Sequence, residues 1–514
     1  MPSRRHILTG AAVAAGAAAL PATAAYAAPA DLFPLGVASG DPLPDGVILW
    51  TRLLADGKLP NRRLDVEWQV ADDERFRRIV RSGRVAARPE LAHSVHVDVR
   101  GLQPGREYFY RFRALGRISP VGRTKTTARD TNRLRFGIVN CQDFQNGYWP
   151  AYWGLAAEDL DVVLHLGDYI YEYDPSSRFA DRNHTTPQTP GLDQLVTLDD
   201  YRARHAQYKT DPALQAAHAA FPWIVTWDDH ETENNYASLI DEIDDTGASH
   251  QDAQQFARQR AAAYQAYYEH MPIRADLRPG SADLRIFRRF DFGRLLRLNV
   301  LDTRQYRTDQ PGGFPGDFGL ATAGAANTAG TLTGVDQERW LLGGLDHSPA
   351  RWNVIAQQVM MSPIQFPNPT GGVPPIIANL DQWDGYAPQR TRLLSHLAAA
   401  RVANPVVLAG DIHSTWFSEL LLNDQPVAVE FTATSVSSDF PIAFDVPLKA
   451  LNPTLNPHVR YFDGSRRGYL RCVVNRSAWH TDVRTVETID VRESPVTTTA
   501  SYVVEAGTSR LVTA

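Results

Sequence analysis

The sequence predicts a layered α/β domain preceded by a small all-β domain, within a chain of 514 residues. Two observations predict this order. Residues 33–127 contain short segments in which apolar and polar residues alternate, the period of half-buried strands. Residues 134–514 contain continuous apolar runs separated by helix-like segments, as expected for strands that are covered on both faces. The formal charge of −6 gives no indication of a nucleic-acid partner.

The N-terminus, residues 1–28, has the pattern of a twin-arginine signal peptide. "SRRHILTG" (3–10) carries two adjacent arginines, an alanine-rich apolar run follows, and Ala25-Tyr26-Ala27 fits a cleavage site. An exposed basic start before an alanine-rich helix is the alternative. We expect export by the twin-arginine machinery and a secreted protein. No later segment approaches about 20 unbroken apolar residues, so no transmembrane helix is expected.

The N-terminal domain (33–127) is expected to consist of strands rich in Val, Tyr, Phe and Trp. A Pro-Gly turn precedes the last of them, in which tyrosines are regularly spaced. This pattern is typical of a fibronectin or immunoglobulin sandwich, with any small antiparallel sheet as the alternative. The strands are expected at "GVILWTRL" (46–53), "DVEWQVA" (65–71), "HSVHVDV" (93–99) and "EYFYRFRAL" (107–115), with a linker at 126–133.

In the larger domain (134–514), apolar β-type runs alternate with helical segments, which predicts a layered α/β architecture. Residues from 470 onward again resemble strands, which either extend the sheet or cover the site. Strands are expected within 134–140, 161–167, 223–228, 296–302, 352–361 and 405–411, helices within 253–271, 336–345 and 390–402, and loops that shape the entrance of a site at 174–200, 312–334 and 363–386.

Polar residues that can bind metals follow four of these strands. They are Cys141, Asp168, the run Asp228-Asp229-His230-Glu231, and Asp411 with His413. Taken singly each has an ordinary explanation, since an Asp after a strand usually caps the next helix. Four ionisable groups in a row beside a buried strand, however, repel one another unless cations hold them. Ligands gather at the carboxyl ends of strands in open α/β sheets. The four strand ends together therefore predict a dinuclear metal site.

The motifs at these strand ends resemble those of a known family. "NCQ" (140–142), "GDYIYEY" (167–173), "WDDHE" (227–231) and "GDIHS" (410–414) are similar to the motifs of PhoD-type alkaline phosphatases and phosphodiesterases. These belong to the calcineurin-like, purple acid phosphatase-like metallophosphoesterases. The resemblance covers nearly the whole mature chain and implies a four-layer sandwich, in which two β-sheets are flanked by helices.

The resemblance also implies a ligand set. Cys141, Asp168, Tyr171 and His413 would bind Fe³⁺, and Asp168 would bridge to a Ca²⁺ site completed by Asp229 and Asp411, with Asp228 as an alternative ligand. Thiolate and tyrosinate suit a high-valent iron, whereas calcium prefers oxygen donors. His230 would contact the phosphate and protonate the leaving oxygen, and Arg304 would clamp the phosphate. A metal-bound Cys141 thiolate cannot pair with Cys472, so no disulfide is expected.

The implied reaction is the hydrolysis of phosphomonoesters, and also of phosphodiesters, by a metal-activated water. Two alternatives remain open. One is a phospholipase D-type phosphodiesterase on the same scaffold, which would act on phosphatidylcholine. The other is a non-catalytic binding protein whose β domain attaches to a polymer, although the complete set of ligands argues against it. A monomer is the expected state.

Overall fold

The computed structural model describes residues 31–55, 59–173, 195–241, 252–311 and 318–514. The predicted signal peptide lies outside the described residues, and so do parts of the expected loops 174–200 and 312–334. Within the described ranges, no helix has the length and apolar character needed to cross a membrane.

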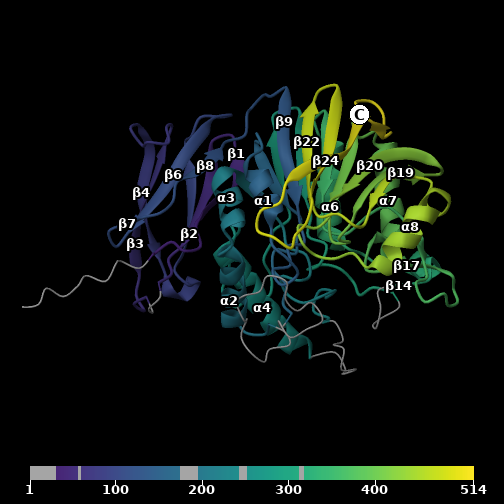
Figure 1. Ribbon diagram of the computed structural model, residues 1–514, viewed down its shortest axis with the longest axis horizontal. Helices are drawn as coiled ribbons and strands as arrows, with labels where there is room; N and C mark the ends of the chain where they lie inside the picture. Colours follow the sequence, from purple (N-terminus) through teal and green to yellow (C-terminus); the bar gives the residue numbers. More distant parts are fainter. Residues whose placement is uncertain (1–30, 56–58, 174–194, 242–251, 312–317) are drawn as a thin grey trace, which may run out of the picture.

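The central element of the described chain is a sheet of ten strands (Figure 1). Its middle strands β9, β10, β11 and β1 run parallel, and antiparallel strands flank them on both sides. The C-terminal strands therefore extend the sheet, which decides between the two alternatives left open by the sequence. The order is β25 (Val512–Thr513), β24 (Val496–Glu505), β23 (Ala478–Val486), β22 (Gly468–Asn475), β9 (Arg133–Val139), β10 (Val162–His165), β11 (Pro222–Val225), β1 (Val37–Leu43), β2 (Gly46–Arg52) and β5 (Ser94–Arg100).

A second sheet has seven strands among the described residues. Its core strands β13, β15, β18 and β20 are parallel, as the continuous apolar runs predicted. The order is β12 (Arg288–Phe292), β13 (Leu296–Val300), β15 (Trp352–Ala356), β18 (Pro405–Ala409), β20 (Gln425–Thr432), β19 (Thr415–Leu422) and β21 (Val459–Asp463). A short third sheet contains β14 (Phe318–Gly319), β17 (Ile376–Asn379) and β16 (Phe366–Pro367).

The two large sheets share one apolar core. Phe136 of β9 and Leu164 of β10 pack in the same cluster as Leu298 of β13 and Val354 of β15. On its other face the ten-stranded sheet packs against α1 (Pro150–Ala156), α2 (Leu198–Lys209), α3 (Pro212–Ala220) and α4 (Ala253–His270). The seven-stranded sheet packs against α6 (Gly334–Asp346) and α7 (Ala387–Ala399). The mixed α/β class is confirmed. The remaining helices are α5 (Ala321–Ala326), α8 (Ile442–Leu455) and the short 3₁₀ helices η1 (Pro89–Leu91) and η2 (Trp383–Tyr386).

The N-terminal segment contributes strands to two sheets. In the described residues, a sheet of five strands contains β4 (Ile79–Ala87), β3 (Leu64–Ala71), β6 (Glu107–Ala114), β7 (Arg117–Ile118) and β8 (Gly122–Lys125). The neighbouring strands β1, β2 and β5 instead continue the ten-stranded sheet, in which β1 pairs directly with β11. The domain boundaries predicted from the sequence stay a prediction. β1 of the expected N-terminal domain forms backbone hydrogen bonds with β11 of the expected larger domain.

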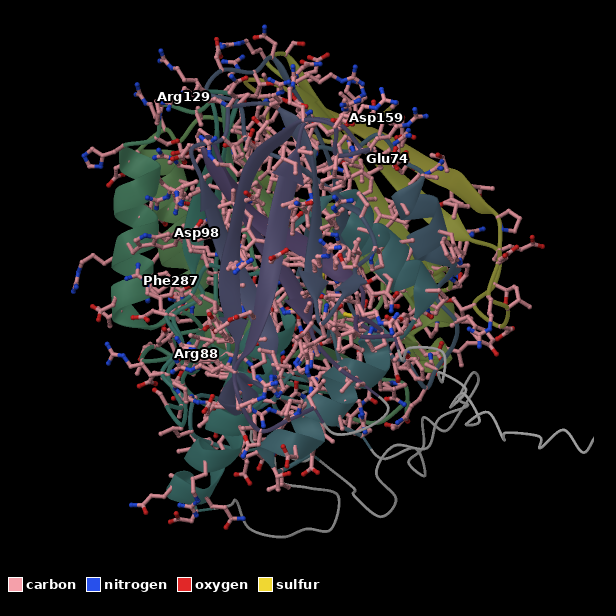
Figure 2. The ribbon with its side chains drawn as sticks, turned by 90° about the vertical axis from the view of Figure 1, so that its left-hand side faces the viewer. Glu74, Arg88, Asp98, Arg129, Asp159 and Phe287 are labelled. Carbon is pink, nitrogen blue, oxygen red and sulfur yellow. The ribbon has the colours of Figure 1, made fainter. Side chains whose placement is uncertain are left out.

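A buried ion pair and a more exposed one also join the N-terminal strands to the rest of the chain. Asp41 of β1 is buried, and Arg288 of β12 donates to it from Nη2 at 2.7 Å. The backbone N–H of Arg274 donates to the same carboxylate at 2.7 Å. The side chain of Arg274 continues to Asp98 of β5, at 2.9 Å; Asp98 is labelled in Figure 2. Removing one partner of the buried pair of Asp41 and Arg288 would leave an uncompensated charge. Arg288 Nη2 also donates to the carbonyl oxygen of Val225 of β11 at 2.8 Å, so this side chain links β1 to β11.

Candidate metal centre

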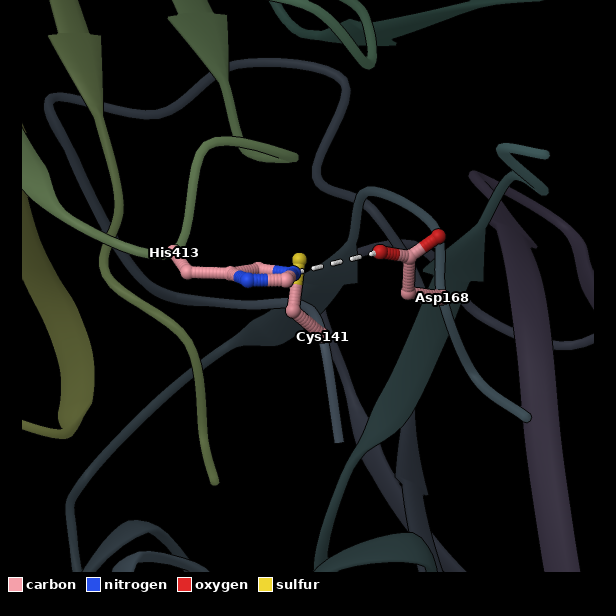
Figure 3. A group of neighbouring side chains, drawn as sticks. All are labelled: Cys141, Asp168 and His413. Carbon is pink, nitrogen blue, oxygen red and sulfur yellow. Dashed lines mark ion pairs between the residues drawn. The ribbon is translucent and has the colours of Figure 1, made fainter. Parts of the chain in front are cut away.

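The predicted ligands follow strands of both large sheets at their carboxyl ends. Cys141, Asp168, Asp411 and His413 all have a left-handed backbone, with φ of 53°, 56°, 66° and 57°. This conformation costs a non-glycine residue about 1 kcal/mol or more and is concentrated at functional sites. It bends the chain sharply where each strand ends. The bend brings side chains from β9 and β10 of one sheet beside those that follow β18 of the other (Figure 3).

Gly167 provides the close approach between two of these bends. Its φ is +118°, and a Cβ there would lie 2.8 Å from the backbone nitrogen of Asp228. We therefore expect Gly167→Ala to destabilise the protein by about 2–5 kcal/mol, because backbone strain and overpacking act together. Chemical denaturation checks this value. Gly343→Ala is the matched control, since a Cβ at this helical position meets nothing within 4 Å; an equal loss in both variants would contradict the prediction.

Glu231 holds the same two bends together. Its buried carboxylate accepts the backbone N–H groups of Asp168 at 3.1 Å and of Asp228 at 2.8 Å. It also accepts the N–H of Tyr169 at 2.6 Å. One side chain thus satisfies three buried donors of two different loops, which fixes the Asp168 loop relative to the Asp228 loop.

Three groups of possible ligands meet within this space. The first is Cys141, Asp168 and His413; the second is Asp168, Asp229 and His230; the third is Asp228, Asp229 and Asp411. Within each group the ligand atoms all lie within 4.8 Å of one another. Asp168 is common to the first two groups and Asp229 to the last two. The groups therefore form one continuous cluster that could hold two ions.

Tyr171 lies beside the first group, and its role as a ligand stays a prediction. Its hydroxyl donates to Asp168 Oδ2 at 3.0 Å and lies 3.1 Å from His413 Nε2. Ser438 Oγ donates to the same hydroxyl at 2.7 Å. The phenol oxygen, the thiol of Cys141 and the imidazole of His413 thus surround one side of Asp168.

The donor set fits metal ions. Asp168 Oδ1, Asp229 Oδ1 and Asp228 Oδ2 are buried and have no hydrogen-bond partner in the described part of the chain. Buried carboxylate oxygens are rarely left in this way, because the desolvation penalty is not repaid. His413 Nδ1 lies 3.0 Å from the carbonyl oxygen of Asp439, which can accept only from an N–H. That contact leaves Nε2 with a lone pair facing the cluster, the usual arrangement for a metal-binding histidine.

The electrostatics of the cluster also require compensating positive charge. Burial and the neighbouring carboxylates raise the pKa of the Cys141 thiol well above its usual value. Burial raises the pKa of Asp411 to about 7, against the attraction of Arg304. Burial disfavours ionised Asp229 as well, but the charges of Arg304 and His230 outweigh it and lower the pKa of that carboxyl. Cations in the cluster would favour the ionised forms of Cys141 and Asp411, because coordination requires deprotonated groups, whereas Asp229 is ionised without them.

His230 lies in the second group and is oriented by an acid. Its Nδ1 is 2.8 Å from Glu172 Oε2, and both side chains are buried. Glu172 also accepts the backbone N–H of Asn234 at 2.7 Å. Burial alone would lower the pKa of His230, but the charges of Glu172, Asp229 and Asp168 raise it well above the ordinary value. The imidazole is therefore suited to carry a proton.

Arg304 lies deeper in the protein than is expected of a side chain that contacts substrate. Its side chain is fully buried and forms ion pairs with Asp228, Asp381 and Asp411. The sequence predicted it as a phosphate clamp, and that role stays a prediction. These contacts favour a role in compensating the charge of the buried carboxylates.

Several residues of the site were not singled out from the sequence. Glu172 lies inside a quoted motif, so its proximity to the candidate ligands was a usable signal. Glu231 was named in the run of ionisable groups, but its contacts with two loops were not predicted. Ser438, Asp439 and Asp381 lie in segments without a recognisable pattern. Gln382, whose Nε2 donates to Asp411 Oδ2, lies in the expected loop 363–386. Both cysteines are buried and free, as expected.

Known proteins are similar to this chain over most of its length. A model of the PhoD-like phosphatase family matches residues 136–483, and a model of the PhoD-like phosphatase N-terminal domain matches residues 18–128. Alkaline phosphatase D of Bacillus subtilis (strain 168) is 43% identical over 492 residues, which cover 92% of this chain and 80% of that protein. A solved structure of PhoD superposes with a TM-score of 0.83 at 40% identity and covers 94% of this chain and 92% of that one.

The mixed α/β fold and the named relative thus define a hydrolase of phosphoric ester bonds. The chain belongs to the PhoD-like phosphatase family.

Proposed function

We propose that the protein is a metal-dependent phosphatase that releases phosphate from phosphomonoesters and also hydrolyses phosphodiesters at an Fe³⁺/Ca²⁺ centre. One observation carries this proposal. Three groups of possible ligands, which share Asp168 and Asp229, lie at the carboxyl ends of strands from both sheets, and within each group the ligand atoms are within 4.8 Å of one another. We interpret the two sheets and their helices as the four-layer sandwich of the metallophosphoesterases, preceded by an immunoglobulin-like domain.

Six side chains would hold the ions. Cys141, Asp168, Tyr171 and His413 supply sulfur, oxygen and nitrogen donors for the iron, and anionic thiolate and phenolate favour the trivalent ion. Asp229 and Asp411 supply hard oxygen donors for calcium, with Asp168 between the two sites and Asp228 adjacent. When bound, the ions would supply Lewis acidity, which activates water toward phosphorus and offsets charge on the phosphoryl oxygens.

The chain's own residues would hold and transfer the proton of the reaction. The Nδ1 proton of His230 is held by Glu172, and the other ring nitrogen is left to give its proton to the leaving oxygen. The ring of His230 lies 4.1 Å from that of Tyr171, between centroids, at an interplanar angle of 32°, and this contact restricts its movement. A preorganised donor of this kind requires no rearrangement as charge develops on the leaving group.

Glu172→Gln tests this role of the buried pair. Glutamine keeps the shape of the side chain but removes the charge that favours protonated His230. We expect kcat to fall about 10–100-fold for an alkyl phosphate, whose leaving group needs the proton, and much less for p-nitrophenyl phosphate. Equal losses on both substrates would show that the pair is only structural. Glu67→Gln, at an exposed salt bridge of β3, is the control.

The proposed activity is tested with matched substrates. Mature protein would be given p-nitrophenyl phosphate, bis-p-nitrophenyl phosphate and phosphatidylcholine, first with calcium and then after EGTA. Release from the monoester that EGTA abolishes and calcium restores is the expected result. Activity unaffected by removal of all metals would overturn the proposal.

A phospholipase D-type activity is a second candidate because apolar side chains are exposed near the site. Ile442 and Val446 of α8 are 76% and 62% exposed, and α8 begins shortly after Asp439, which contacts His413. Such a face suits contact with a lipid substrate. Choline release from phosphatidylcholine that exceeds monoester turnover would favour this candidate.

We also propose that the protein is exported by the twin-arginine machinery and acts outside the cell as a monomer. The support is the arginine pair and the apolar run of residues 3–25. Detection of the mature chain in culture medium, and its loss when both arginines are changed to lysine, would test export.

A further inference from the structure

We propose that Arg304 is a built-in counter-ion of the third ligand group, where its guanidinium compensates the carboxylates and competes with the bound cation. This inference rests on the proposed calcium at that group. It gives the buried arginine a role in controlling cation affinity and in keeping the cation-free protein folded.

The contacts of Arg304 cover every member of the group. Nε donates to Asp228 Oδ1 at 2.5 Å, and Nη2 donates to Asp411 Oδ1 at 3.1 Å. Nη2 also lies 3.6 Å from Asp229 Oδ2. These are the three carboxylates that could together hold one ion. The guanidinium of Arg304 therefore contacts the same carboxylates that would bind a cation.

A second layer holds Arg304 in place. Asp381 Oδ1 accepts from its Nη1 at 2.7 Å, and Arg307 donates to that same oxygen at 2.5 Å. Arg307 Nη2 also donates to the carbonyl of Asp381 at 2.6 Å. The guanidinium of Arg304 is fully buried and held from two directions. It cannot leave the carboxylates without breaking this network, which distinguishes it from a side chain that reaches out to substrate.

Two carboxylate oxygens of the third ligand group are available to bind a cation. Asp228 Oδ2 and Asp229 Oδ1 keep no hydrogen-bond partner among the described residues, whereas Asp411 uses both oxygens, on Arg304 and Gln382. A cation can therefore enter beside the arginine without displacing it. Like charges a few ångströms apart in a protein interior repel strongly, so the arginine weakens cation binding. Without any cation, the same charge prevents the carboxylates from repelling one another.

The experiment compares Arg304→Met with Arg307→Met. Both remove a buried arginine that binds Asp381, but the hydrogen bonds of Arg307 go to Asp381 and not to the three carboxylates. Each protein would be dialysed against EGTA and titrated with calcium by calorimetry, and Tm would be measured with and without calcium. For Arg304→Met we expect a calcium Kd at least about tenfold lower than that of the parent, and a Tm that falls sharply in EGTA. For Arg307→Met we expect a calcium Kd close to that of the parent.

Other outcomes would overturn either the inference or the proposed metal centre. Parent-like calcium affinity in Arg304→Met, with a parent-like Tm in EGTA, would overturn the inference while leaving the proposed function intact. If Arg304→Met folds at no calcium concentration, Arg304→Lys decides: retention of charge should keep the protein folded in EGTA, and a calcium requirement for its folding would overturn the inference. A parent that binds no calcium would instead overturn the proposed centre itself.

Discussion

Replacing Asp168 with asparagine is expected to abolish phosphatase activity, with a loss of about 10³-fold or more in kcat/KM. Asp168 belongs to two of the three ligand groups, and its Oδ1 is buried without a hydrogen-bond partner in the described residues. Asparagine keeps the size but removes the charge that both ions would share. We expect bound iron and calcium to fall together, which elemental analysis of the purified variant would measure.

The control for this prediction is Asp211→Asn, which changes a half-buried aspartate outside the cluster. Asp211 caps α3 by accepting the backbone N–H groups of Ala213 and Leu214, a contact that asparagine also provides. It should keep the metal content and activity of the parent. An Asp168→Asn variant that retained both ions and most of its activity would contradict the assigned ligand role.

The second large effect is expected for His230→Gln, with a fall in kcat of about 10²–10⁴-fold for substrates with poor leaving groups. Glutamine can still hydrogen-bond Glu172, but it cannot protonate a leaving oxygen. The loss should shrink as the pKa of the leaving group falls, since a good leaving group departs without a proton. A plot of log kcat against leaving-group pKa would therefore become steeper in the variant.

His396 is the control position for this substitution. It lies on α7 and pairs with Asp346 at 2.8 Å, outside the ligand groups. His396→Gln should leave the leaving-group dependence unchanged. If His230→Gln slowed all substrates equally, the histidine would act on binding or on structure rather than on proton transfer. In that case Glu172→Gln on the His230→Gln background would also have no selective effect.

The sequence allowed the convergence of the candidate ligands to be predicted, because they lie at the ends of buried apolar runs. The structure brings Cys141, Asp168, Asp229, Asp411 and His413 together. They follow strands of two different sheets, and the packing of these sheets against each other was not evident from the strand ends alone. The left-handed backbone at Asp168 was not predictable, because it depends on the acceptance of N–H groups by Glu231 from two loops. Likewise, the residues that neighbour Arg304 in the sequence do not indicate that carboxylates from distant segments surround its side chain.

The course of the N-terminal strands illustrates the same limit. The strands predicted within 46–53 and 93–99 match β2 and β5 in position. β2, however, is buried at every residue rather than on one face, because it lies inside the ten-stranded sheet. Alternation specifies which face of a strand is buried, but it does not specify the neighbour to which the backbone bonds. The pairing of β1 with β11 depends on Gly40, where a Cβ would clash with backbone carbonyls of Trp223 and Pro272, and on the ion pair between Asp41 and Arg288.

The strand order of the large sheet has a consequence for how the protein is made. The strands that precede Cys141, Asp168 and Asp228 are bordered by β1, from the start of the chain, and by β22, from near its end. A growing chain on the ribosome therefore leaves the edge of β9 open until β22 has been synthesised, and exposed edges of this kind promote aggregation. Contacts between such distant segments also slow folding. Truncation before β22 would release a chain with every candidate ligand present but the sheet beneath them incomplete.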